Sequence, residues 1–359
     1  MSSDPIDPVE VRERAREKAK GGDTNSCSDF DALHNLYHSR KEYAERMPRP
    51  PKLHAPLLPI QSLHVDASRF WAVIIGIDGY PSHNKLLGCV SDAIKMGTFL
   101  YEDLGVPKDR IECLIDGTHT LEFCSKTYHP SRANILMTLF GLIDNPEIQK
   151  DENIIIYFAG HGAAYRAEGI DGVEAIEALC PIDRGSRDAD GMLIADISDR
   201  QINTILTQIS RAKGRRITLI LDCCHAGSIT RAPPGGRVRA SRPLQDSDVS
   251  LQDMLVAADA ELMSKHFPGY RSILSKEWFP DMDSHVALAA CEAFQIAIEV
   301  KGQGKETGGY FTTHLLAALR SGCLTRETTY RGLLEFIPVS DRQTPVVAGT
   351  QMDALLWFQ

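Results

Sequence analysis

The sequence lacks both an excess of positive charge and a long apolar run. It has 39 Lys and Arg against 48 Asp and Glu, a formal net charge of −9. This argues against a generic binder of nucleic acids or anionic membranes, because such a binder needs a dominant basic face. No apolar stretch approaches the roughly 18 residues that span a bilayer. The start, MSSDPIDPVEVRERAREKAKGG, lacks the apolar core of a signal peptide.

A disulfide framework is also missing. The nine cysteines are scattered, odd in number and often placed inside apolar runs. In a chain of this length the pattern predicts reduced thiols, and therefore a cytoplasmic or nuclear location. With 43% hydrophobic and 24% charged residues, the composition is typical of a soluble globular protein.

The sequence divides into two regions that differ in residue composition and pattern. Residues 1–66 combine a charged stretch, a small polar stretch and a Pro-rich stretch, which predicts a partly disordered N-terminal extension or pro-segment. Residues 67–359 alternate apolar strand-like runs with amphipathic helical ones, which predicts an α/β fold with a mostly parallel sheet and helices on both faces. We expect strands over 70–77, 110–115, 153–160, 216–222, 285–290 and 344–348, and helices over 91–105, 131–143, 198–209, 310–319 and 329–337.

Two of these strands end in reactive residues. The sequence NIIIYFAGHG places His161 just past the end of one strand. The sequence ITLILDCCHAG places Asp222, Cys223, Cys224 and His225 at and just past the end of another. Reactive groups in such sheets gather at the carboxyl ends of the strands. If these strands are neighbours, a Cys–His pair suits covalent acyl transfer. The alternatives are an ordinary loop histidine with a buried cysteine, or a thiol redox sensor built on Cys223 and Cys224. A zinc site is disfavoured because no second Cys/His cluster has suitable spacing.

Four blocks carry a family resemblance. WAVIIGIDGY, LLGCVSDA, YFAGHG and ILDCCHAG occur in this order and resemble the signature blocks of caspase-like peptidases, specifically metacaspases. The similarity runs from about Phe70 to the C-terminus. It implies a caspase-like (caspase–haemoglobinase) fold, with a large-subunit-like part over 67–230, a loop or linker over 227–284 and a small-subunit-like part over 285–359.

The resemblance also implies roles for individual residues. His161 is the catalytic base and acid, and the motif Asp-x-Cys-His-x-Gly selects Cys224, not Cys223, as nucleophile. The backbone amides of Gly162 and Cys224 form the oxyanion hole. The pocket for the residue before the cut bond is lined by the following residues: Cys89, Asp92, Ala159 (where many relatives carry serine) and Asp222.

Two carboxylates in this pocket predict cleavage after Arg or Lys, since they hold a guanidinium through charge-assisted hydrogen bonds. The alternative for Asp92 is an acid at a helix N-terminus that is stabilised by the helix dipole. The loop 227–248 carries Arg231, Arg237, Arg239 and Arg242, so self-cleavage there is a hypothesis with no favoured bond; a solvated surface loop is the alternative.

The sequence differs from its relatives at positions that bind calcium in the family. Their Asp-Asp pair before a helix is Ser198-Asp199 here, and a later acid is replaced by Arg231. Because Ca²⁺ needs about 6–8 oxygen ligands, we expect weak calcium dependence or none. A different set of loop acids is the alternative ligand group: Asp171, Glu174, Asp188, Asp190 and Asp196.

The sequence thus predicts a cysteine endopeptidase that cleaves after Arg or Lys, with no cofactor and no bound metal. Its expected partners are protein or peptide substrates, not nucleic acid or membrane, and we expect a cytoplasmic monomer. The alternative is an inactive caspase-fold protein that acts by binding. A zymogen form and a link to programmed cell death are implied by the resemblance alone.

Overall fold

A computed structural model describes residues 65–81, 85–166, 175–224, 237–244, 250–292, 295–301, 307–340 and 342–358. They belong to one compact unit, Leu53–Gln359. The predicted N-terminal extension, residues 1–66, lies almost wholly outside the described residues, so its nature stays a prediction. Within the described ranges, no helix is long and apolar enough to cross a membrane.

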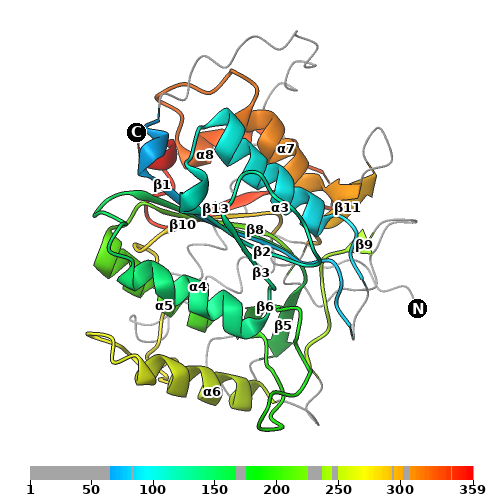
Figure 1. Ribbon diagram of the computed structural model, residues 1–359, viewed down its shortest axis with the longest axis vertical. Coiled ribbons are helices and arrows are strands. Elements are labelled where there is room, and N and C mark those ends of the chain that lie inside the picture. Colours follow the sequence, from blue (N-terminus) through cyan, green and yellow to red (C-terminus); the bar gives the residue numbers. More distant parts are fainter. Residues whose placement is uncertain are drawn as a thin grey trace, which may run out of the picture. The chain divides into compact units, whose positions relative to one another are not determined.

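A seven-stranded sheet forms the centre of the unit (Figure 1). Every residue of Phe70–Gly76 and Asn153–Ala159 is buried, as expected for strands covered on both faces. All neighbouring strands pair in parallel except the last pair, β10 and β13, which is antiparallel. In spatial order the strands are β13 (Val346–Ala348), β10 (Val286–Ala289), β8 (Ile217–Asp222), β4 (Asn153–Ala159), β1 (Phe70–Gly76), β2 (Ile111–Ile115) and β3 (Lys126–Tyr128).

Helices cover both faces of this sheet, as predicted. Figure 1 shows α3, α7 and α8 on one face and α4 and α5 on the other, with α6 beyond α5. Ser131 and Ser198 cap α4 and α5, since their side chains accept the Asn134 and Gln201 amide hydrogens. The bounds are α3 (Cys89–Thr98), α4 (Arg132–Asp144), α5 (Asp199–Lys213), α6 (Leu251–Ser264), α7 (Tyr310–Leu319) and α8 (Tyr330–Leu333), with 3-10 turns at Ala67–Arg69, Lys108–Arg110, Leu334–Phe336 and Leu356–Phe358.

The start of α3 corrects a prediction. Ser91 does not open this helix; α3 begins at Cys89 and passes after Thr98 into a π-helical turn, Phe99–Asp103. Gly88, at the N-cap, provides no side-chain cap. The acceptor comes instead from Asp78 in the loop after β1, whose carboxylate accepts the Cys89 and Val90 amide hydrogens.

Two small antiparallel sheets lie outside the central one, and the sequence did not predict them. One contains β5 (Gly162–Arg166), β6 (Ala175–Leu179) and β7 (Ile197–Ser198); the other contains β9 (Arg237–Val238), β11 (Ile298–Lys301) and β12 (Thr307–Gly309). The segment 227–284 is therefore more than a loop or linker, because it contains β9 and α6. Helix α6 has a capping box at Ser250 and buries Met254 and Leu262.

Candidate active site

The two reactive strand ends lie side by side. Strand β4 pairs in parallel with β8, and Ala159 is opposite Asp222. His161 and Cys224 each follow two residues later, so they emerge from equivalent positions at the carboxyl edge of the sheet. Both side chains are buried, with His161 1% and Cys224 0% exposed. The assumption that these strands are neighbours is confirmed.

Tyr80 holds the histidine in place. Its ring lies 4.7 Å from the His161 ring, and its hydroxyl oxygen accepts the His161 amide hydrogen at 2.9 Å. The same hydroxyl donates to the Cys180 carbonyl at 3.0 Å. A Cβ at Gly160 would come within 2.6 Å of the Tyr80 hydroxyl oxygen, so the glycine before His161 makes room for this contact. Sequence reasoning missed Tyr80, which ends the block WAVIIGIDGY.

The nucleophile candidate contacts the chain that leads into β11. The Cys224 sulfur lies 2.6 Å from the Ala297 amide nitrogen and donates to the Ala297 carbonyl at 3.3 Å. Cys291 interacts with Cys224 through its side chain, and this hydrogen bond, together with burial, raises the pKa of the Cys291 thiol. Burial also raises the pKa of Cys223. Both neighbouring thiols are therefore held neutral, as poor nucleophiles.

Two backbone amides converge on one oxygen. The Gly162 amide donates to the Arg239 carbonyl at 3.1 Å, and the Cys224 amide donates to the same carbonyl at 3.0 Å. These are the two amides predicted to form the oxyanion hole. Preorganised donors of this kind stabilise negative charge that develops on a carbonyl oxygen.

The side chain of Arg239 fills an acidic pocket beside these amides. Its Nη1 lies 2.8 Å from Oδ2 of Asp222, and its Nη2 lies 2.5 Å from Oδ2 of Asp92. A third acid, Glu299, lies 3.7 Å from Nη2. The guanidinium and all three carboxylates are buried. The structure therefore brings together the predicted pair Asp92 and Asp222, and adds Glu299, which sequence reasoning missed because β11 was not predicted.

The start of α7 fixes the two predicted acids. The Gly309 amide donates to Asp92 at 2.5 Å, and the Thr312 amide donates to Asp222 at 3.1 Å. A helix N-terminus favours negative charge, which supports these carboxylates. Burial nevertheless raises the pKa of Asp92 to about 6; Arg239 works against this rise, and the nearby charge of Asp222 adds to it.

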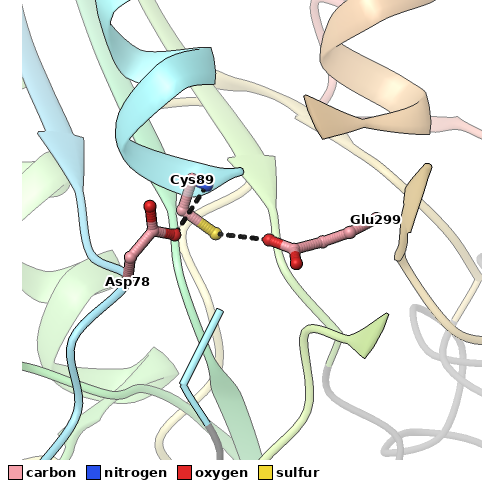
Figure 2. Close-up of side chains that lie close together, drawn as sticks. All are labelled: Asp78, Cys89 and Glu299. Carbon is pink, nitrogen blue, oxygen red and sulfur yellow. Dashed lines mark hydrogen bonds between the residues drawn. The ribbon is translucent and has the colours of Figure 1, made fainter. Parts of the chain in front are cut away.

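Asp78, Cys89 and Glu299 form a compact group at the start of α3 (Figure 2). One potential ligand atom from each lies within 4.8 Å of the others. Glu299 Oε1 already accepts the Gly88 amide hydrogen at 2.8 Å and the Cys89 thiol at 3.8 Å. Burial raises the pKa of Cys89 well above its usual value, so the thiol is not a ready metal ligand. The group is better explained as the cap of α3 and one wall of the arginine pocket.

The predicted alternative calcium ligands do not form a common site in the described residues. Asp196 is buried and accepts hydrogen bonds from Arg184 and Tyr165. Asp188 accepts the Asp190 and Met192 amide hydrogens within its own turn. Several sequence candidates lie outside the described residues: Asp171, Glu174, His225 and Arg231.

The segment around Arg239 crosses the site in extended form. Strand β9 pairs antiparallel with β11, with Val238 opposite Ile298, and the Arg239 amide donates to the Ala297 carbonyl at 3.1 Å. On the other side, the Ser241 amide donates to the Gly162 carbonyl at 2.8 Å. This corrects the alternative of a solvated loop for this stretch: Arg239 is 0% exposed. Ala159 lies in the floor of the site, buried between Gly76 and Asp222.

Comparison with known proteins shows which proteins the part of the chain around this site is similar to. Residues 71–233, which include His161 and Cys224, match the family model described as metacaspase, peptidase C14 domain. Over this stretch the chain is similar to a metacaspase peptidase domain. The caspase-like fold predicted from the sequence is confirmed by this match together with the mostly parallel central sheet.

Curated metacaspases match over 45% of this chain. Metacaspase-3 of Arabidopsis thaliana is 29% identical over 165 residues, covering 45% of this chain and 41% of that protein. Metacaspase-1B of Aspergillus fumigatus and metacaspase-1 of Saccharomyces cerevisiae are each 28% identical over 165 residues, covering 45% of this chain and 36% and 34% of those proteins. The chain thus spans less than half the length of these relatives. A solved protein of Geobacter sulfurreducens matches with a TM-score of 0.48 and 18% identity, covering 77% of this chain and 92% of that one.

Proposed function

We propose that this protein is a cysteine endopeptidase that cleaves peptide bonds after arginine, with Cys224 as nucleophile and His161 as proton carrier. One observation carries the proposal. Arg239 lies in the site as the residue before a cut bond would lie, with its guanidinium between Asp92 and Asp222. At the same time its carbonyl oxygen faces the amides of Gly162 and Cys224.

The chemistry follows from this arrangement. The Cys224 thiolate attacks the carbonyl carbon of the substrate arginine, and the carbonyl oxygen becomes an oxyanion held by the two amides. His161 takes the thiol proton and gives it to the leaving amine as the C–N bond breaks. Water then hydrolyses the thioester and releases a peptide that ends in arginine.

The pocket favours arginine over lysine. Asp92 and Asp222 bind different nitrogens of one guanidinium, and a planar fork matches two carboxylates in a way that a single ammonium does not. A substrate aspartate would meet three carboxylates at close range, which is strongly unfavourable in a buried site. We therefore propose arginine as the preferred residue, lysine as a weaker one, and aspartate as excluded.

We further propose that catalysis needs no calcium. Of the acids weighed as ligands, Asp196 is already paired with Arg184, and the family position at Ser198 is occupied by a helix cap. We also propose a monomer, because both edges of the central sheet are strands of three residues, β3 and β13, which leaves little backbone to pair with a second copy. The eight described cysteines are all free, which supports a reducing compartment such as the cytoplasm.

Hydrolysis of fluorogenic peptides that end in Arg, Lys or Asp tests the proposal. The wild type, Cys224→Ala and the adjacent control Cys223→Ala are compared, each with added calcium and with a chelator. Cleavage after Arg that survives in Cys223→Ala, disappears in Cys224→Ala and ignores the chelator is the expected result. Absence of cleavage of every peptide would favour the alternative, an inactive protein that acts by binding.

A further inference from the structure

The segment that occupies the candidate active site belongs to the chain itself. Its position identifies a particular bond as a substrate. We infer that the bond between Arg239 and Ala240 is the bond that the protein cleaves in itself, and that the uncut segment Arg237–Ser241 blocks the site against other substrates. This inference rests on the proposed function and names its first substrate.

The residues before the bond bind as a strand. β9 adds to the edge of β11, with Val238 opposite Ile298 and Arg237 opposite Glu299. The Arg239 amide continues this ladder by donating to Ala297. Adding an extended strand to a sheet edge is a common way to bind a peptide, because backbone hydrogen bonds fix its position and register.

The residues after the bond are held as firmly, by a buried network. Arg184 forms a two-pronged ion pair with Asp196, with two nitrogen–oxygen distances of 2.6 Å. It also donates to the Ser241 hydroxyl at 2.8 Å and to the Arg242 carbonyl at 3.1 Å. Arg184 and Asp196 are 1% and 0% exposed. The bond is thus fixed from both sides across the catalytic edge of the sheet.

Among the arginines of this loop that the structure describes, Arg239 is distinguished by burial. Arg237 and Arg242 are exposed, whereas Arg239 is fully buried. Arg237 donates to the Lys85 carbonyl on the surface. The geometry therefore selects one bond where the sequence favoured none.

The reaction balances within the chain and one water molecule. The Cys224 sulfur bonds to the Arg239 carbonyl carbon, the bond to the Ala240 nitrogen breaks, and that nitrogen receives the proton carried by His161. Water then cleaves the thioester. The products are residues 1–239 with a new carboxylate, residues 240–359 with a new amine, and the free Cys224 thiol.

Blocking follows from occupancy. The guanidinium of Arg239 takes the contacts with Asp92 and Asp222 that a substrate arginine needs. Its carbonyl oxygen already accepts the amide hydrogens of Gly162 and Cys224, which a substrate carbonyl would need. Because a tethered group competes at a high effective concentration, peptides added in solution gain access only after β9 has left.

The full chain made by cell-free translation tests the inference, with intact mass and arginyl-peptide cleavage followed together. We expect a lag in peptide cleavage and a split between Arg239 and Ala240 whose rate does not change over a 100-fold range of protein concentration. Arg237→Gln and Arg242→Gln, as matched controls, should split like the wild type. Arg239→Gln should stay whole at this bond yet cleave the peptide without a lag.

A second variant separates cutting from blocking. Ala240→Pro keeps Arg239 in its pocket but replaces the bond by one that peptidases rarely cut, and proline also lacks the amide hydrogen. It should stay whole and cleave the peptide at least 10-fold more slowly than Arg239→Gln. Thermal melting of both variants checks folding.

The outcomes distinguish the two proposals. A wild type that cleaves arginyl peptides while whole, or that splits at another bond, overturns this inference and leaves the peptidase standing. An Ala240→Pro variant as active as Arg239→Gln overturns blocking. If neither the wild type nor folded Arg239→Gln cleaves any arginyl peptide, the peptidase proposal falls, and this inference falls with it.

Discussion

Oδ2 of Asp222 lies 2.8 Å from Nη1 of Arg239. Asp222 ends β8, two residues before Cys224. The group proposed to recognise arginine and the group proposed to attack it are therefore carried by one rigid strand end. A shift of that strand would move both together, which keeps the selected side chain and the carbonyl carbon in register.

Asp222→Asn should lower kcat/KM for arginyl peptides by about 30-fold or more, because truncating one partner of a buried charge pair costs about 2–5 kcal/mol. The Asn oxygen can still accept from Thr312, so the fold should survive. Steady-state kinetics check this, with the exposed Asp353→Asn as control. A normal kcat/KM of the Asp222→Asn variant would show that Asp222 does not contribute to the binding of arginine.

Glu299→Gln should have a smaller effect, about 10-fold on kcat/KM for arginine, since Glu299 lies 3.7 Å from the guanidinium and contributes mainly charge. Glutamine keeps an acceptor for the Leu87 and Gly88 amides, so α3 should keep its cap. The same peptide set and a thermal melt measure both points. Equal rates for Glu299→Gln and the wild type would restrict Glu299 to helix capping.

Arginine binding should depend on the ionisation of Asp92. With a guanidinium in the pocket, the pKa of Asp92 is about 6, raised mainly by burial. Without the cation its pKa is higher still, since the charge that favours the carboxylate is gone. Affinity for arginine should therefore be flat below about pH 6, rise from there, and level off once the empty pocket is itself ionised.

Titration calorimetry with an arginyl peptide, between pH 5 and 8, measures this dependence in a chain with Cys224→Ala and Arg239→Gln. These changes prevent turnover and empty the pocket. Adding Asp92→Asn should weaken binding and flatten the profile. A pH dependence that persists in the Asn variant would assign the titration to another group.

Asp196→Asn should destabilise the fold by about 3–5 kcal/mol, because it leaves the buried Arg184 without its counter-charge. Urea unfolding in the Cys224→Ala chain, which stays whole, measures the loss. Asp353→Asn is the matched control: its pair with Arg331 is exposed and should contribute about 0–1 kcal/mol. Equal losses in the two variants would mean that burial does not set the strength of these pairs.

The sequence predicted those parts of the fold and site that local pattern controls. Apolar runs located β1, β4 and β8 because strands buried on both faces have few polar residues. His161 and Cys224 could be placed because they directly follow such strands. Asp92 and Asp222 were identified through the resemblance, and the structure brings them to one guanidinium.

Features controlled by distant partners could not be predicted. Arg239 lies in a stretch rich in Gly, Pro and Ser, where nothing local indicates burial; its carboxylate partners come from α3, β8 and β11. Glu299 was missed for the same reason. Residue Cys89 begins α3 because Asp78, eleven positions earlier, caps it, a contact that no helix-start pattern contains.

The hold of Arg184 on Ser241 and Arg242 has a further consequence for the cut chain. A new amine at Ala240 would not diffuse away, since the chain behind it stays attached to the network around Asp196. Held near the thioester, it competes with water for the same carbon, so the peptide bond can reform until water has hydrolysed the thioester. Under the proposed self-cleavage, hydrolysis of the thioester and the departure of Arg237–Arg239 that it allows, and not the attack of the sulfur, would then make the cut irreversible.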